Sequence, residues 1–209
     1  MTHEFDKDYW EQRWRQGSGG VPAAMERNPP NPYLVRGTGG LTAGTALDAG
    51  CGAGAEAIWL ATQGWQVTAA DISADALDRA RRRGTISGVS EQVRWIEADL
   101  TVWSPDTQFD LVTTHYAHPA MAQLDFYDRI STWVAPGGTL LVVGHSSAGH
   151  GHHHHAPAEA SITVADISAV LDDAYWETVS AEEQLRTLPG PGGKTADLRD
   201  VVVQATRRS

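Results

Sequence analysis

Cysteine is nearly absent from this sequence of 209 residues, because Cys51 is the single one. No internal disulfide can form, which excludes a disulfide-stabilised secreted scaffold. No apolar run approaches the roughly 20 residues that a helix needs to span a bilayer. The first residues, Met1 to Asp6, are acidic and lack the apolar segment of a signal peptide. We expect a soluble, cytoplasmic protein that does not act at a membrane.

Basic residues are also few, since 16 lysines and arginines stand against 26 acidic residues, for a formal net charge of −10. Binding to a nucleic-acid backbone needs clustered Lys and Arg side chains against the phosphates. The charge balance therefore disfavours nucleic acid as the main partner and favours a small-molecule substrate. Nothing in the composition indicates the oligomeric state.

Three glycines stand at alternate positions, 50, 52 and 54, where a predicted strand at 45–48 leads into a predicted helix at 53–62. Glycine allows positive φ and lets a ligand lie directly on the backbone, and the following helix N-terminus faces that ligand. Asp48 ends the strand, and its carboxylate would repel a pyrophosphate but attract a cationic amino group. This stretch predicts a site for S-adenosylmethionine.

Strands and helices alternate after this turn, which predicts a parallel, doubly wound sheet with helices on both faces. We expect strands at 65–70, 93–97, 109–113 and 138–143, and helices at 73–83 and 120–134. Such sheets bind ligands outside the carboxyl ends of their strands. The predicted strand ends carry five polar residues: Asp48, Asp71, Asp99, Thr114 and His145.

The flanking segments complete a single α/β domain, 1–209, in this interpretation. Residues 1–40 hold an aromatic helix and a Pro-rich loop that form a possible lid, and 41–145 form the cofactor-binding core. Residues 146–162 form a His-rich loop, and 163–209 hold a helix and a terminal hairpin of strands 176–188 and 195–206. The seven strands form a Rossmann-like three-layer α/β/α sandwich that ends in an antiparallel hairpin.

The glycine turn also satisfies a second fingerprint. Gly50, Gly52 and Ala55 match G-x-G-x-x-[GA], and Asp71 lies where a ribose-binding acid belongs, so an NAD(P)-dependent oxidoreductase is the alternative. Three features favour S-adenosylmethionine instead: Asp48 before the turn, Asp99 after the third strand, and the hairpin that closes the chain.

Four motifs resemble those of the class I S-adenosylmethionine-dependent methyltransferases. They are Leu47–Gly54, Ala70–Ser73, Ile96–Leu100 and Phe109–Val112. The N-terminal segments Tyr9–Trp14 and Pro30–Leu34 further resemble small bacterial methyltransferases of the tellurite-resistance and thiopurine type. The resemblance implies a methyltransferase that transfers a methyl group to a small-molecule acceptor through an oxygen, nitrogen or sulfur/chalcogen nucleophile, and releases S-adenosylhomocysteine.

The resemblance also implies roles for individual residues around the methionine and ribose of the cofactor. Gly50, Gly52 and Gly54 would shape the turn under the methionine portion. Asp48 would hold its amino group, and Asp71 would accept both ribose hydroxyls.

Around the adenine, Ile72 and Leu100 would contact the ring and Asp99 would bind its N6 amine. Thr114 would line the cavity near the sulfonium. From the aromatic N-terminus, Trp14 is predicted to touch the cofactor as part of a lid, although packing of this helix on the domain explains it as well.

Candidate catalytic groups are three histidines, His115 and His118 after the fourth strand and His145 after the fifth. A histidine base would assist a hydroxyl or amine acceptor, whereas a soft thiol needs none. His115 is our first candidate, and Tyr116 is its rival for orienting the substrate.

Two further features say less about the function. Cys51 is a small residue that fits the turn. The run His150–His155 can bind metals adventitiously but lacks the spacing of a zinc site, so no metal is expected. A cofactor-binding protein without catalysis, whose His-rich loop senses metal, is the remaining alternative.

Overall fold

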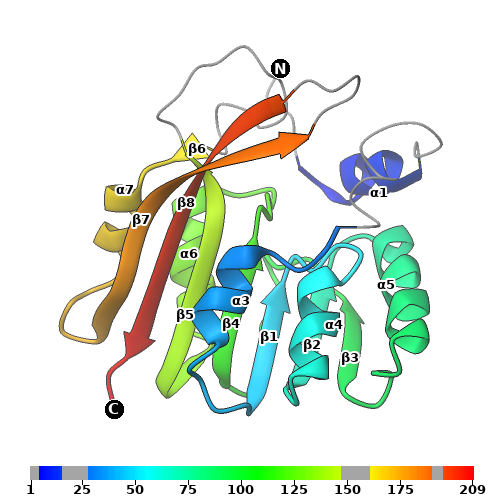
Figure 1. The fold of residues 1–209 in the computed structure, drawn as a ribbon, viewed down its shortest axis with the longest axis horizontal. Coiled ribbons are helices and arrows are strands. Elements are labelled where there is room, and N and C mark those ends of the chain that lie inside the picture. The colour runs from blue at the N-terminus through cyan, green and yellow to red at the C-terminus, as the bar shows by residue number, and fades with distance from the viewer. Residues whose placement is uncertain (1–4, 16–27, 147–160, 190–194) are drawn as a thin grey trace.

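The computed structural model describes residues 5–15, 28–146, 161–189 and 195–209. The strands are β1 (Thr45–Ala49), β2 (Gln66–Asp71), β3 (Val93–Glu97), β4 (Phe109–His115), β5 (Val134–Ser146), β6 (Ser161–Ile162), β7 (Trp176–Pro189) and β8 (Thr195–Arg207). The helices are α1 (Lys7–Arg15), α3 (Pro32–Thr38), α4 (Ala55–Thr62), α5 (Ala74–Ile86), α6 (Gln123–Ser131) and α7 (Val164–Val170). They form a three-layer α/β/α sandwich (Figure 1).

The sheet has the order β3-β2-β1-β4-β5-β8-β7, and β6 pairs with β5 outside this path. Strands β1 to β5 are parallel, while β8 runs antiparallel to β5 and pairs with β7 in a hairpin. The predicted fold is therefore confirmed, with the short β6 as an addition. The strand order reverses between β1 and β4, and ligands of such sheets bind at the carboxyl ends beside this switch point.

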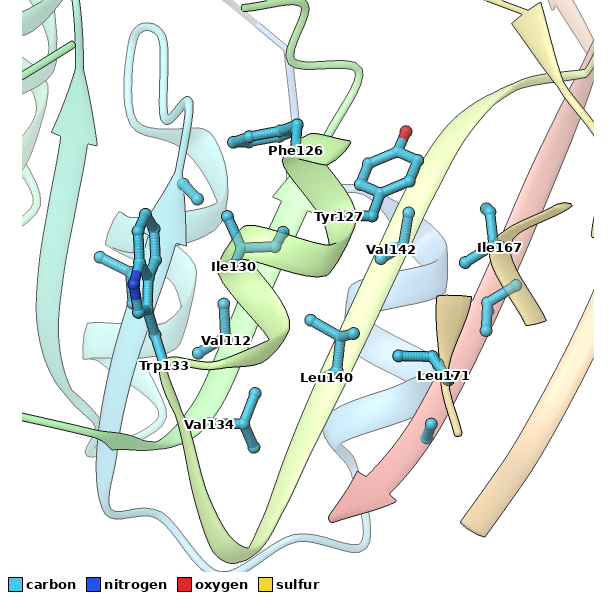
Figure 2. Close-up of a cluster of buried hydrophobic side chains, with 14 of the residues drawn as sticks. Val112, Phe126, Tyr127, Ile130, Trp133, Val134, Leu140, Val142, Ile167 and Leu171 are labelled. Atoms are coloured by element: carbon cyan, nitrogen blue, oxygen red, sulfur yellow. The ribbon is translucent and has the colours of Figure 1, made fainter. Parts of the chain in front are cut away.

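Two apolar layers cover the two faces of the sheet. Alternate residues of a strand point to opposite faces, so Leu47, Val112 and Leu140 join one layer while their neighbours Ala46, Leu111 and Leu141 join the other. Helices α6 and α7 pack on the first layer (Figure 2), and α3, α4 and α5 pack on the second. This rigid centre holds the strand ends in place.

Helix α5 does not end at Gly84 as predicted, but continues to Ile86. A Cβ on Gly84 would lie 3.3 Å from the Trp95 ring, so this glycine allows the helix to approach β3 closely. The start of α5 agrees with the predicted helix at 73–83. Ser73 caps it, because its side chain accepts a hydrogen bond from Ala76 N.

Two predicted boundaries around α6 were also wrong. Helix α6 covers only Gln123–Ser131, and β5 begins at Val134, where the prediction had placed the end of the helix. Val134 pairs with Phe109 across a register shift, which tertiary packing and not local periodicity creates. Strand β4 extends to His115, so Thr114 and His115 lie inside the strand and do not follow it.

Within the described ranges, no helix is both long and apolar enough to cross a membrane. The His-rich run His150–His155 lies outside these ranges.

Candidate functional site

The glycine turn joins β1 to α4 in the conformation that the sequence predicts. Gly50, Gly52 and Gly54 all have positive φ, at 81°, 52° and 76°. Gly50 N donates a hydrogen bond to Ala70 O at 2.9 Å, which ties the turn to β2. A Cβ on Gly54 would lie 2.6 Å from Trp95, so a side chain is excluded by space as well as by conformation.

Asp48 lies buried directly before this turn and is only 1% exposed. Its Oδ2 atom has no hydrogen-bond partner among the described residues. Burial, and then the nearby Glu56 carboxylate, raises the pKa of Asp48 well above its usual value. A buried carboxylate oxygen without a donor costs free energy, and the ammonium group of a ligand would supply that donor. The residues here fit the methionine portion of S-adenosylmethionine.

Asp71 ends β2 and connects the turn to the start of α5. Its Oδ2 accepts a hydrogen bond from Gly52 N at 2.8 Å, and its Oδ1 accepts one from Ser73 N at 2.9 Å. A carboxylate offers about four acceptor positions, so both oxygens can still accept from ligand hydroxyls. Burial raises the pKa of Asp71, partly offset by these backbone bonds. Ile72 is half-buried in the bend that follows.

Asp99 lies two residues beyond the end of β3, the strand next to β2. Its Oδ1 accepts hydrogen bonds from Thr101 N at 2.9 Å and Thr101 Oγ1 at 2.7 Å, which hold the turn. The neighbouring Leu100 is buried in the core, and its carbonyl accepts a bond from Arg129 Nε at 2.9 Å. The three predicted acids thus lie at the carboxyl ends of three adjacent strands.

Helix α1 lies beside α5 at the carboxyl edge of the sheet (Figure 1). From there it brings Trp14 to the glycine turn. Trp14 is 4% exposed and packs against Ala53 and Ala76. A Cβ on Gly52 would lie 3.3 Å from the Trp14 ring. Trp14 therefore packs on the glycine turn, and its contact with the cofactor stays a prediction.

Thr114 and His115 occupy the end of β4 with different partners. Thr114 Oγ1 donates to Ala49 O at 2.8 Å, so its hydroxyl links β4 to β1. The Nδ1 atom of His115 lies 3.5 Å from Thr113 Oγ1, and its buried Nε2 has no partner among the described residues. Burial lowers the pKa of His115 to about 3, so the imidazole is neutral at physiological pH.

A cluster next to this strand end joins the predicted residues Tyr116, His118 and His145 to two residues that the sequence did not indicate, Arg186 and Asp200. Tyr116 has a φ of 55°, a strained value for a residue other than glycine. Its hydroxyl accepts a hydrogen bond from Arg186 at 2.8 Å, and Arg186 Nε donates to the fully buried Asp200 at 2.9 Å. The His145 ring lies 4.7 Å from the Tyr116 ring, and His118 lies 5.7 Å from His145.

Sequence reasoning missed Arg186 and Asp200 because they belong to the terminal hairpin, about 70 residues or more from Tyr116, and no short motif connects them. It also missed Glu11, which accepts a hydrogen bond from Ala74 N at 2.7 Å. One signal was available for Glu11: it stands three residues before Trp14 in a predicted helix, a spacing that puts both side chains on one face.

Comparisons with known proteins agree with this geometry. A family model described as a methyltransferase domain matches residues 46–138. Thiocyanate methyltransferase 1 of Arabidopsis thaliana is 25% identical over 193 residues, which is 88% of this chain and 80% of that protein. For three other curated relatives, the chain spans only 19, 60 and 48% of the relative's own length.

Solved structures share the fold at lower identity. A structure from work on the conversion of a disulfide bond into a thioacetal group during echinomycin biosynthesis superimposes with a TM-score of 0.73, at 20% identity, over 97% of this chain and 91% of that one. TehB from Haemophilus influenzae gives 0.70 at 12% identity, over 95% and 67%. The resemblance of the N-terminal segments to methyltransferases of the tellurite-resistance and thiopurine type stays a prediction.

These matches do not support the alternative of an NAD(P)-dependent oxidoreductase, since the family model and the relatives named above are methyltransferases. The matches agree with the turn, the acids at three strand ends and the terminal hairpin. Residues 46–138 match the methyltransferase domain, and the fold is the Rossmann-like fold of the class I S-adenosylmethionine-dependent methyltransferases.

Proposed function

We propose that this protein transfers a methyl group from S-adenosylmethionine to a small-molecule acceptor. The observation that carries the proposal is the buried Oδ2 atom of Asp48 beside the glycine turn, which has no hydrogen-bond partner in the part of the chain that the structure describes. A pyrophosphate would worsen the electrostatics at this point, whereas the ammonium group of the methionine portion would donate to Asp48 and neutralise it.

The remaining cofactor contacts follow the strand ends. Asp71 accepts from the ribose hydroxyls, and Asp99 accepts from the adenine amine. The side chains of Ile72 and Leu100 lie against the adenine ring. Trp14 and Thr114 lie at the methionine end of the site, Trp14 as part of the cover and Thr114 by holding β4 against β1.

The cofactor supplies a methyl group on a sulfonium, which is already an activated leaving group. The protein's own residues are therefore needed mainly to align the acceptor and to keep water out. Helix α1 covers the turn, and Trp10 Nε1 fastens it to the segment after β4 by donating to His118 O at 3.1 Å.

We further propose that the acceptor lies near His115 and Tyr116 and carries a nucleophile that needs no strong base. A neutral imidazole whose pKa is about 3 accepts protons poorly, but its Nε2 can accept a hydrogen bond. A thiol or another soft nucleophile meets this condition, and Arabidopsis thiocyanate methyltransferase 1 is named for a small sulfur-containing acceptor.

Other relatives are named for a release-factor glutamine and for ribosomal RNA. The net charge of −10 favours the small molecule over RNA for this chain.

Calorimetry with S-adenosylhomocysteine tests the cofactor assignment. We expect micromolar-scale binding to the wild-type protein. Asp71→Asn should weaken it by about tenfold or more, because a hydrogen bond to a charged group contributes about 1.5–3 kcal/mol. Asp106→Asn changes an exposed acid in the loop that leads into β4, not at a carboxyl end of the sheet, so this control should bind normally. Preferential binding of NADH would reject the proposal.

An acceptor screen with methyl-labelled S-adenosylmethionine tests the reaction. Thiols should be methylated in preference to amines and alcohols, and His115→Gln should reduce kcat/KM by about tenfold through lost positioning of the acceptor. A steep gain in activity between pH 5 and 7 that His115→Gln abolishes would instead identify His115 as a base titrating near its ordinary pKa.

A further inference from the structure

Helix α1 buries one carboxylate at the carboxyl edge of the sheet. Glu11 is only 6% exposed, although its helix neighbours Asp8, Gln12 and Arg15 are exposed to solvent. Burying a carboxylate is unfavourable unless donors compensate for its lost hydration. The position of Glu11 therefore needs a physical reason.

Two consecutive backbone amides at the start of α5 hold two different acids. Ser73 N donates to Asp71 Oδ1 at 2.9 Å, and Ala74 N donates to Glu11 Oε1 at 2.7 Å. Because neighbouring amides bind them, the two carboxylates lie close together at the end of β2. The Glu11 charge is near enough to contribute, after burial, to the raised pKa of Asp71.

A purely structural role explains only part of this arrangement. Glu11 caps the N-terminus of α5, where an anion is favourable. However, Ser73 already caps this helix through Ala76 N, and two like charges at one place repel each other. A ligand with two hydroxyl donors would relieve that repulsion, because each hydroxyl could donate to one carboxylate.

We propose that Glu11 and Asp71 together bind the ribose hydroxyls of the cofactor, so that α1 supplies one of the ribose contacts. This rests on the proposed function, which assigns the ribose to Asp71. Glu11 Oε2 lies 3.5 Å from Arg15, a long contact, and Arg15 is held more closely by Asp75 at 2.7 Å. The Asp75 side chain also interacts with Glu11. An oxygen of Glu11 therefore keeps acceptor capacity for a hydroxyl.

The arrangement makes α1 dependent on the ligand. Lys7 pairs with Glu97 at the end of β3, and Arg15 pairs with Asp75 on α5, so the helix bridges the two elements on either side of the ribose position. A hydroxyl donating to Glu11 adds a contact that fastens α1 when the cofactor is bound.

Calorimetry with S-adenosylhomocysteine and its 2′-deoxy and 3′-deoxy analogues tests the proposal. We expect Glu11→Ala to weaken S-adenosylhomocysteine binding by about tenfold or more, since the lost hydrogen bond is to a charged group. The same substitution should weaken binding of one of the deoxy analogues by less than threefold, because that analogue already lacks the hydroxyl that donates to Glu11. Asp8→Ala removes an exposed acid from the same helix and should change none of the three affinities.

Three outcomes separate the possibilities. Equal losses for all three ligands in Glu11→Ala would overturn the proposal and show that Glu11 only positions α1. Glu11→Gln keeps an acceptor for Ala74 N, so it should retain the unfolding midpoint of the ligand-free protein while still losing affinity for S-adenosylhomocysteine. If Asp71→Asn loses less affinity for a deoxy analogue than for S-adenosylhomocysteine, and Glu11→Ala does not, the role of Glu11 is rejected while the proposed function stands. If the wild-type protein binds none of the ligands, the proposed function fails with it.

Discussion

Asp48 shows how one buried side chain links stability to ligand binding. The backbone of β1 places it beside the glycine turn, where burial and the Glu56 carboxylate raise its pKa well above the usual value. In the ligand-free protein, burial therefore favours the neutral form of Asp48 more than in an exposed carboxyl group. A cationic group on Asp48 Oδ2 would reverse this preference, because an opposite charge favours the ionised form.

The raised pKa of Asp48 predicts a pH dependence of stability with a definite sign. The native state holds this proton at pH values where the unfolded state, with a carboxyl pKa of about 3.9, has released it. The free energy of unfolding therefore falls as the pH rises from about 4 toward the folded-state pKa. Urea denaturation at a series of pH values should show this fall in the ligand-free wild-type protein, with a smaller fall in Asp48→Asn.

The difference between the two proteins reports on Asp48, because the other groups with raised pKa values, Glu56, Asp71 and Cys51, are present in both proteins. Asp78→Asn, an exposed acid on α5, should follow the wild-type curve. Identical pH profiles for wild-type and Asp48→Asn would contradict the burial argument.

Helix α1 is attached mainly by burial and by bonds to backbone groups. Its ion pairs Lys7–Glu97 and Arg15–Asp75 are exposed to solvent, and such pairs contribute little to stability. Trp14 is buried against the glycine turn, and Arg79 donates to Trp14 O at 3.0 Å. Most of the docking free energy should come from Trp14.

Trp14→Ala should release α1 without unfolding the domain. Replacing a buried aromatic side chain with alanine costs about 3–5 kcal/mol, and a helix of nine residues is not stable on its own. We expect hydrogen exchange of the α1 amides to become fast, while the amides of β1 and β4 keep their protection. Lys7→Gln should leave the α1 exchange rates within about threefold of wild type. Unchanged protection of α1 in Trp14→Ala would contradict this account.

The terminal hairpin connects distant parts of the molecule. Strand β8 pairs with β5 and β7 pairs with β8, which brings Arg186 and Asp200 beside Tyr116 at the end of β4. Gln204 Nε2 also donates to Gly37 O on α3 at 3.0 Å. The hairpin thus supports the acceptor side of the proposed site, whereas β1, β2 and β3 carry the cofactor side.

Asp200→Ala should therefore impair binding of the acceptor but not binding of the cofactor. Breaking a buried ion pair costs about 3–5 kcal/mol; because the Arg186 side chain is 26% exposed, we expect about 2–3 kcal/mol in chemical denaturation. The affinity for S-adenosylhomocysteine should stay within about threefold of wild type, while KM for the acceptor rises. Glu182→Ala, which removes an exposed ion pair between the hairpin and Arg36 on α3, should change stability by less than about 0.5 kcal/mol. A large loss of cofactor affinity in Asp200→Ala would contradict this division.

Local sequence was enough to predict the strand–turn–helix unit at 45–62 and the acids at three strand ends. Periodicity identifies strands, and positive φ with close backbone approach demands glycine, so these features are encoded within a few residues. The boundary errors had a different origin. Gly84 was predicted to end a helix, but its role is to admit the Trp95 ring, which belongs to β3.

By itself, then, the sequence determined the order of the elements, the fold family and the cofactor that suits the turn, because each rests on short-range spacing. Only the tertiary structure decided that Glu11 lies beside Asp71 and that Arg186 and Asp200 reach Tyr116. It also decided that Asp48 Oδ2 finds no donor among the described residues. These contacts join residues from distant elements, and no local pattern specifies which side chains packing will bring together or leave unpaired.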